Sequence, residues 1–137
     1  MLEVNRRVLE LMKLFLAAAL AALVLFVASC DRNNEAERAA RSMTGGEPSR
    51  GRAAITRYGC SACHTIPGVK GATALVGPPL DRIASRSYIA GVMPNSPENM
   101  IRWIENPPGI DKMTAMPNLG VNDQDARDIA SYLYTLK

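Results

Sequence analysis

The sequence is poor in aromatic residues, and it lacks any run of alternating β-branched residues. Aromatic residues make up 5% of the 137 residues, so a small domain has little large apolar material for its core and would gain from a bound apolar group. The missing alternation argues against a sheet and favours an all-α fold. A chain of this length holds about one domain, so we expect one functional site.

A strong charge of either sign is also lacking. The formal net charge is +3, and basic residues are interleaved with acidic ones rather than gathered into a stripe. Binding of nucleic acid favours a basic stripe or patch. We therefore expect no nucleic acid among the partners of this protein.

One long apolar run exists, and it lies near the N-terminus. Basic residues precede an apolar stretch at 14–27, the arrangement of a secretory signal peptide. The run is shorter than the roughly 20 residues that span a bilayer, so an uncleaved transmembrane helix is the weaker alternative. The segment 27–30 (VASC) resembles the lipobox of bacterial lipoproteins, in which the cysteine is lipidated after cleavage. We expect a lipoprotein signal peptide at 1–29 and a lipid anchor on Cys30; an ordinary signal peptide with an incidental cysteine is the alternative.

The next segment, residues 31–49, is polar and has almost nothing large to bury. Its glycines and proline favour a flexible tether, which we assign to residues 30–49, while its glutamates and alanines leave a short helix at 34–43 as the alternative. By resemblance to lipoproteins, Asp31 beside the lipidated cysteine favours retention on the periplasmic side of the bacterial inner membrane. Either form of the tether holds the following domain, residues 50–137, off that membrane.

Three helices are predicted in this domain, separated by irregular segments. The first starts at Ser49 as N-cap, ends near Tyr58 and leads directly to a cysteine pair. The second follows Ser96, and the third begins at Asn122 and carries apolar residues three and four apart. About 35 residues without periodicity separate the first two helices, a length that a bound cofactor can pack from inside.

The chemistry of the chain is concentrated in Cys60-Ser61-Ala62-Cys63-His64. The pattern C-x-x-C-H is an attachment signature for c-type haem. Two thiols three positions apart can add to the two vinyl groups on one porphyrin edge, and the adjacent imidazole can then reach the iron. We expect one covalent haem c on Cys60 and Cys63, with His64, the single histidine of the chain, as an axial ligand.

Other uses of a cysteine pair explain these residues less well. Structural zinc requires four Cys or His ligands, and with Cys30 on the membrane only three remain. A thioredoxin-like pair follows a strand in a βαβ unit, whereas this pair follows a predicted helix. A disulfide is allowed in an exported protein, but it gives no role to the neighbouring histidine.

The second axial ligand of the iron cannot be a histidine, because none is left. A thioether sulfur is the obvious substitute, and Met100 suits the apolar face of a predicted helix better than a ligand role. Met116 is the preferred ligand, because it precedes a stiff proline in a loop without periodicity; Met93 has the same local form and is the runner-up. His/Met ligation raises the reduction potential and leaves no vacant iron site, which suits an electron carrier without a small-molecule substrate.

Beyond the cysteine motif, residues 50–137 resemble the class I c-type cytochromes. Gly77, Pro78 and Arg86 match a family loop in which a proline carbonyl accepts a hydrogen bond from the haem histidine and an arginine meets a haem propionate. Because Pro79 follows Pro78, two carbonyls are candidates for the bond to the histidine.

Three further residues carry the resemblance, and a fourth departs from the family pattern by one position. Asn106 precedes Met116 by the family spacing of ten residues, which excludes the runner-up methionine. Thr114 falls at a position that often bonds a propionate, and Trp103 falls where the family has a buried aromatic residue near the methionine. Gly51, one residue further from Cys60 than the family pattern has it, is the candidate for a close crossing of the N- and C-terminal helices.

The implied class I fold has three main helices and irregular loops around one covalent haem. Residues 86–99 look most like the cytochrome c domain tethered to subunit II of some bacterial haem-copper oxidases. This likeness implies a respiratory electron carrier rather than an enzyme, with redox proteins as partners: an oxidase, a dehydrogenase or a bc-type complex. Arg57, Lys70 and Lys112 are candidates for a basic docking rim, and an ordinary solvated face explains them equally well. A haem-based sensor of small ligands and an accessory structural subunit of an oxidase are the alternative functions.

Overall fold

The structure is a computed structural model that describes the backbone of residues 2–137 and the side chains of residues 9–23 and 34–137. The chain divides into two compact units, Met1–Glu35 and Ala36–Lys137. Helix α1 (Leu2–Thr44) forms the first unit and supplies the first residues of the second. No described helix is both long enough and apolar enough to cross a membrane. The side chain of Cys30 lies outside the described residues, so the signal peptide and the lipid anchor stay predictions.

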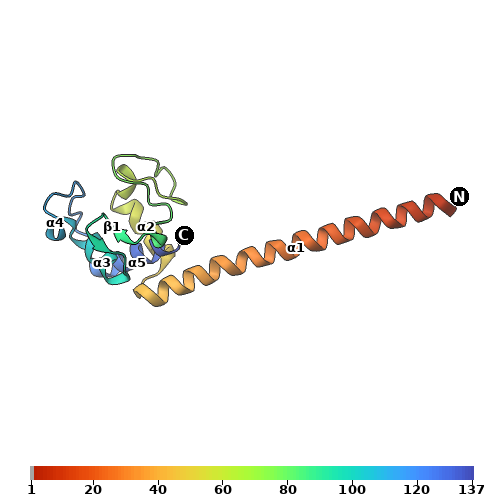
Figure 1. Ribbon diagram of the computed structural model, residues 1–137, viewed down its shortest axis with the longest axis horizontal. Coiled ribbons are helices and arrows are strands. Elements are labelled where there is room, and N and C mark those ends of the chain that lie inside the picture. Colours follow the sequence, from red (N-terminus) through yellow and green to blue (C-terminus); the bar gives the residue numbers. More distant parts are fainter. Residues whose placement is uncertain (1) are drawn as a thin grey trace. The chain divides into compact units, whose positions relative to one another are not determined.

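The second unit consists of helices and loops, with one two-stranded hairpin among its described residues. Its main helices are α2 (Pro48–Arg57), α3 (Pro97–Glu105) and α5 (Asp123–Tyr134), so the all-α class with three main helices is confirmed (Figure 1). The shorter elements, which sequence patterns did not predict, are two 3-10 turns (Cys60–Ala62 and Ile83–Ser85), strands β1 (Tyr88–Ile89) and β2 (Met93–Pro94), and helix α4 (Pro107–Ile110).

Side-chain caps begin two of the main helices where they were predicted. The Ser96 side chain accepts a hydrogen bond from the amide of Asn99 at 3.2 Å, and Asn122 accepts one from the amide of Asp125 at 2.9 Å. The predicted cap at Ser49 is wrong by about two residues, because α2 begins at Pro48 and Glu47 occupies the cap position without a side-chain bond. Proline at a first helical position needs no amide partner, which explains the earlier start.

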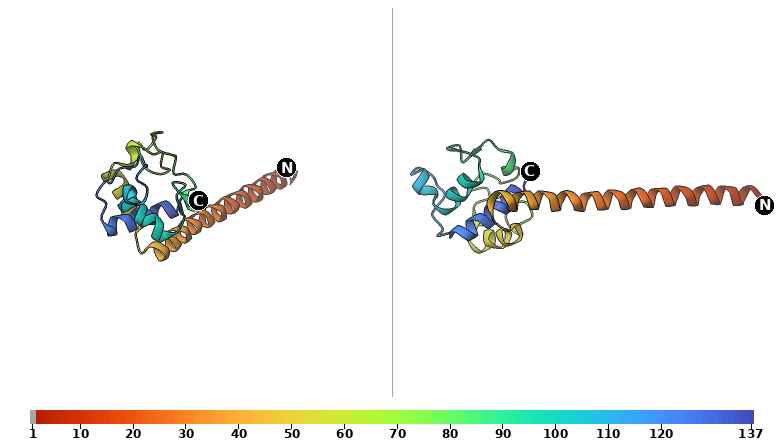
Figure 2. Two further views of the ribbon diagram at one scale, coloured as in Figure 1. Left: turned by 60° about the vertical axis from the view of Figure 1, so that its left-hand side comes forward. Right: turned by 90° about the horizontal axis from the view of Figure 1, so that it is seen from below.

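Helices α2 and α5 cross with their backbones in direct contact, side by side in Figures 1 and 2. A Cβ atom added to Gly51 would lie 1.9 Å from the carbonyl oxygen of Asp128, so only glycine fits at the crossing. Gly51 is therefore the close-crossing residue that the sequence predicted. The helix that leads into the cysteine motif is thereby held against the end of the chain.

The same crossing holds a buried carboxylate. Asp128 is 1% exposed. It accepts hydrogen bonds from Arg50 Nε at 2.7 Å, from the amide of Glu47 at 2.7 Å and from Gln124 Nε2 at 3.1 Å. Burial by itself raises the pKa of Asp128, but these three donors outweigh it and the net pKa lies below the ordinary value. The ionised carboxylate is thus the form that ties α2 to α5.

Replacing Asp128 with asparagine is expected to lower the free energy of unfolding by about 2 kcal/mol at pH 7, because charge-assisted hydrogen bonds are lost. A carboxyl group whose folded-state pKa is depressed stabilises above its unfolded pKa of about 4, and this contribution disappears as pH falls through the lower folded pKa. Urea unfolding of the holoprotein at pH 7 and pH 3 should show the difference between variant and parent shrinking in acid. The exposed Asp123→Asn is the control and should change stability far less at pH 7. A D128N deficit of equal size at both pH values would contradict the assignment.

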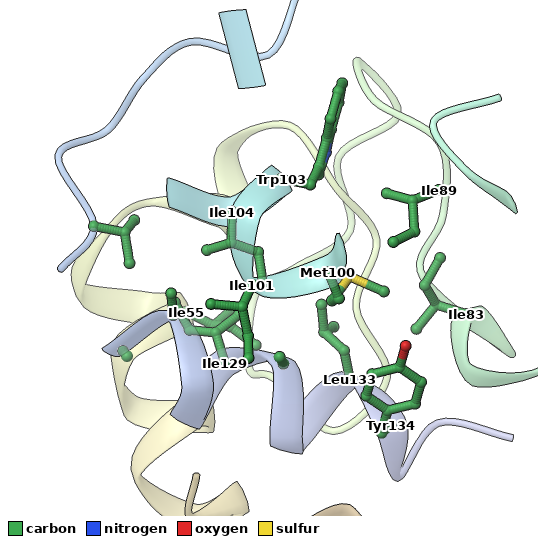
Figure 3. Packing of buried hydrophobic residues seen from close by; sticks show 14 of the residues in the cluster. Ile55, Ile83, Ile89, Met100, Ile101, Trp103, Ile104, Ile129, Leu133 and Tyr134 are labelled. Carbon is green, nitrogen blue, oxygen red and sulfur yellow. The ribbon is translucent and has the colours of Figure 1, made fainter. Parts of the chain in front are cut away.

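Helix α3 packs across α5 and completes the core. Met100, Ile101 and Ile104 on α3 and Ile129 and Leu133 on α5 are all buried. Figure 3 shows these side chains meeting between the two helices. They follow the three-and-four spacing of the sequence, so each helix buries one apolar stripe.

The structure contradicts the second half of the flexible tether predicted at 30–49. Helix α1 continues to Thr44, and Ala40 and Thr44 are buried in the second unit. The alternative of a helix at 34–43 describes this stretch better. The polar composition led to the wrong prediction of a flexible tether, because alanine and threonine can be buried in a segment that has no apolar run.

Candidate functional site

A tight turn after α2 brings the cysteine motif together. Gly59 adopts φ +72, a left-handed conformation that favours glycine, and ends the helix. The amides of Cys63 and His64 then both donate to the carbonyl of Cys60, at 3.2 and 3.0 Å. Both thiols are free and half-buried, and burial raises the pKa of Cys60. The turn therefore offers two unpaired thiols and one imidazole within five residues.

The imidazole of His64 is held by the loop that follows. Its Nδ1 lies 2.7 Å from the carbonyl oxygen of Pro78. Because a carbonyl can only accept, Nδ1 carries the proton and Nε2 keeps its lone pair for a metal. Of the two candidate carbonyls in the sequence, the structure uses that of Pro78 and not that of Pro79.

Gly77 brings the backbone against the imidazole ring. A Cβ atom at this position would lie 2.4 Å from Cε1 and 2.7 Å from Nδ1 of His64. The amide of Gly77 also donates to the carbonyl of Cys63 at 2.7 Å. Contacts with the loop and the cysteine turn thus fix both the plane and the tautomer of the His64 ring.

Arg86 lies on the same loop and not in open solvent. Its Nη2 donates to the carbonyls of Pro79 at 2.5 Å and Asp81 at 2.9 Å. These carbonyls lie one and three residues after the Pro78 carbonyl that holds His64, so the guanidinium stiffens the loop. Contact between Arg86 and a haem propionate stays a prediction.

Met116 lies in a loop pinned at two points. The Thr114 hydroxyl accepts a hydrogen bond from the amide of Met116 at 3.2 Å, and Asn106 Oδ1 accepts one from Asn118 Nδ2 at 3.3 Å. The Met116 side chain is half-buried against the core. The spacing from Asn106 to Met116 therefore has a structural basis, while the propionate bond of Thr114 remains untested.

The competing methionines occupy other environments. Met100 is buried on α3, as its apolar position predicts, and Met93 is buried in strand β2. Met113 is 91% exposed. Met116 alone among these four is half-buried in a polar loop, which suits a sulfur presented to a bound group.

Trp103 is buried at 7% exposure. Figure 3 shows its ring extending from α3 away from Ile101 and Leu133. The side chain therefore belongs to the part of the core outside the contact between α3 and α5. The sequence predicted a buried aromatic residue here, and its proximity to haem is not tested.

The basic rim proposed from the sequence is only partly free. Arg57 Nη2 lies 2.6 Å from Asp125 Oδ1 and its guanidinium stacks over Tyr58. The Tyr58 hydroxyl donates to Asp125 Oδ2 at 2.7 Å, and this bond, followed by that from Arg57, lowers the pKa of Asp125. Lys70 and Lys112 remain exposed. Sequence reasoning missed this cluster because its members are 67 and 68 residues apart.

The donor set fits haem c better than a bare metal ion. Within the part of the chain that the structure describes, no three His, Cys, Asp or Glu side chains gather closely enough to hold a metal ion. Two free thiols, an imidazole with an open Nε2 and a half-buried thioether are instead the groups that a covalent haem requires. The zinc alternative therefore gains no support from the structure.

Comparison with known proteins agrees with this chemistry. A family model described as cytochrome c matches residues 48–137, well over half of the chain. Cytochrome c oxidase subunit 2 of Alkalihalophilus pseudofirmus is 29% identical over 90 residues, which are 65% of this chain and 25% of that protein. The chain thus spans about a quarter of the length of this relative. No solved structure gives a significant match.

Proposed function

The chain belongs to the cytochrome c family, whose members bind covalent haem c and transfer electrons, and from that premise we propose that it is a membrane-tethered carrier of single electrons in a bacterial respiratory chain. The observation that carries the proposal is the 2.7 Å contact between His64 Nδ1 and the Pro78 carbonyl inside a C-x-x-C-H turn. This contact orients an imidazole for iron and leaves the neighbouring thiols for attachment.

The chain supplies attachment and axial ligation, and haem c, when bound, supplies an iron that exchanges one electron. Cys60 and Cys63 provide the two thiols for attachment, and His64 provides an imidazole nitrogen. Met116 would hold the iron through its thioether, which would favour the reduced state and raise the potential. Arg86 stabilises the loop that carries the Pro78 carbonyl.

Electron exchange requires little movement of these residues. The imidazole is fixed by Gly77 and Pro78, and the methionine loop is pinned through Thr114 and Asn106. Rigid ligands keep the surroundings of the two oxidation states alike, so little of the structure has to rearrange during transfer. This rigidity suits a carrier better than a sensor, which needs a ligand that leaves.

The partner and the location form the finer part of the proposal. The relative from A. pseudofirmus is named as an oxidase subunit, which supports a terminal oxidase as an electron acceptor for this chain. A dehydrogenase or a bc-type complex would serve as donor. The lipobox-like segment ending at Cys30 supports a lipid anchor on the periplasmic side of the inner membrane.

Optical spectroscopy of the full chain matured with haem c tests the proposal. The expected result is a c-type haem spectrum in pyridine and alkali, with pigment that acidified acetone does not extract. The reduced holoprotein should pass electrons to a cytochrome c oxidase. Colourless protein, or pigment released into acetone, would refute the covalent site.

A further inference from the structure

Residues 36–47, here named the N-terminal extension, lie before the cytochrome c match yet belong to the compact second unit. Ala40 has no exposed surface and belongs to the hydrophobic core cluster, and Thr44 is 2% exposed. A solvated tether would leave both side chains open to water. The extension is therefore packed as part of the domain.

Direct contacts fasten the extension to α5. A Cβ atom at Gly46 would lie 2.1 Å from the carbonyl oxygen of Arg127, so the two backbones touch there. The amide of Glu47 donates to Asp128 Oδ1 at 2.7 Å, and Arg127 Nη1 donates to the carbonyl of Thr44 at 3.4 Å. These bonds join residues about 80 positions apart, so they hold the extension in place and are not local turn contacts.

The extension also has an internally fixed end. The Thr44 hydroxyl donates to the carbonyl of Ala40 at 2.9 Å and accepts a bond from the amide of Gly46 at 3.1 Å. Arg41 pairs with Glu47 across the turn at 2.9 Å. Packing on the domain therefore already holds from Ala40 to Glu47, within a compact unit that begins at Ala36 and not at residue 50.

We propose that the N-terminal extension is a docked part of the haem domain, so that only the helical residues 31–35 of α1 separate the domain from Cys30 and the domain serves a partner embedded in the same membrane. This inference rests on the proposed function, including the lipid on Cys30. Six residue steps from Cys30 to Ala36 span at most about 20 Å, whereas a tether up to residue 50 would span about 70 Å. A short tether keeps the domain beside the membrane surface and raises its effective concentration toward an acceptor in that membrane.

Lengthening the tether tests the functional half of the inference. A 20-residue Gly/Ser segment is inserted between Glu35 and Ala36 of the lipidated holoprotein, which is reconstituted in vesicles with a membrane-embedded cytochrome c oxidase. A longer tether lets the domain explore a thicker layer above the membrane, whose depth grows roughly as the square root of tether length, so electron transfer to the oxidase should fall about twofold. Oxidation by dissolved ferricyanide, the control acceptor, should not change. An oxidase rate that stays equal or rises would overturn the inference.

Hydrogen exchange of the full-chain holoprotein tests the docking itself. Once the signal peptide is cleaved before Cys30, α1 keeps only residues 30–44, and an isolated helix of that length is marginal in water, so slow exchange at Ala40 requires contact with the domain. Gly46→Val should accelerate exchange of residues 36–44 at least tenfold, while Ser42→Ala, at an exposed position of the same helix, should not. Fast exchange throughout 36–44 in the unaltered protein would overturn the inference. If the holoprotein passed electrons neither to the oxidase nor to ferricyanide, the proposed function would be refuted. The hydrogen-exchange result would still test the docking of the extension.

Discussion

Replacing Gly77 with alanine is expected to weaken the bond between His64 and the haem iron about 10–100-fold, the usual cost of disturbing a partner of a metal-ligating histidine. The added Cβ would lie 2.4 Å from Cε1 of the ring, so the ring must turn and leave the Pro78 carbonyl. A weaker ligand is released at higher pH, because protonation of the imidazole competes with the iron. Acid titration followed by the haem spectrum should show the release of His64 shifted upward by about one to two pH units.

Gly71→Ala is the matched control for this variant. Gly71 has φ +77 and nothing within 4 Å of an added Cβ, so alanine there brings backbone strain of about 1 kcal/mol without touching the histidine. Its acid midpoint should equal that of the parent protein. A G77A variant with the parental midpoint would show that the imidazole does not need the Pro78 carbonyl.

Replacing Met116 with alanine is expected to lower the reduction potential by on the order of 0.2 V, within the roughly 0.8 V that axial ligands control. The reduced variant should also bind carbon monoxide at neutral pH, which the six-coordinate parent should not. Electron transfer to an oxidase should drop strongly. Redox titration, a carbon monoxide difference spectrum and oxidase turnover measure these three effects.

Two other methionines provide the controls. Met113→Ala removes a side chain that is 91% exposed and should leave the potential unchanged. Met93→Ala opens a cavity beside β1 and should lower stability by about 2 kcal/mol or more without creating a carbon monoxide site. If M93A and not M116A lowers the potential, the runner-up is the ligand. Carbon monoxide binding by the unaltered reduced protein would favour the sensor alternative.

Local patterns in the sequence predicted much of the candidate site. The C-x-x-C-H motif, the caps at Ser96 and Asn122 and the close approach at Gly51 all depend on neighbours in sequence or on one residue type with one physical use. The structure confirms the two caps and the close approach at Gly51. Such features can be predicted from sequence because glycine, cysteine and capping residues have few alternative roles.

Contacts between residues that are distant in the sequence could not be predicted from it. The bond of Arg50 to Asp128 spans 78 residues, and nothing near either residue marks it. The hairpin at Tyr88–Pro94 has two-residue strands, too short for a visible alternation. The docked extension escaped prediction because its buried contact surface consists of alanine, threonine and glycine, which polar linkers also contain.

Helix α5 contacts α2, α3 and the N-terminal extension, although it lies more than 60 residues after α2 in the sequence. It touches α2 at Gly51, the extension at Gly46, and the loop at Pro67 through the Tyr132 hydroxyl at 2.6 Å. Contacts this distant in sequence are slow to form, so α2 and the cysteine turn close upon α5 late in folding. The attachment cysteines therefore stay accessible to haem until the domain has closed.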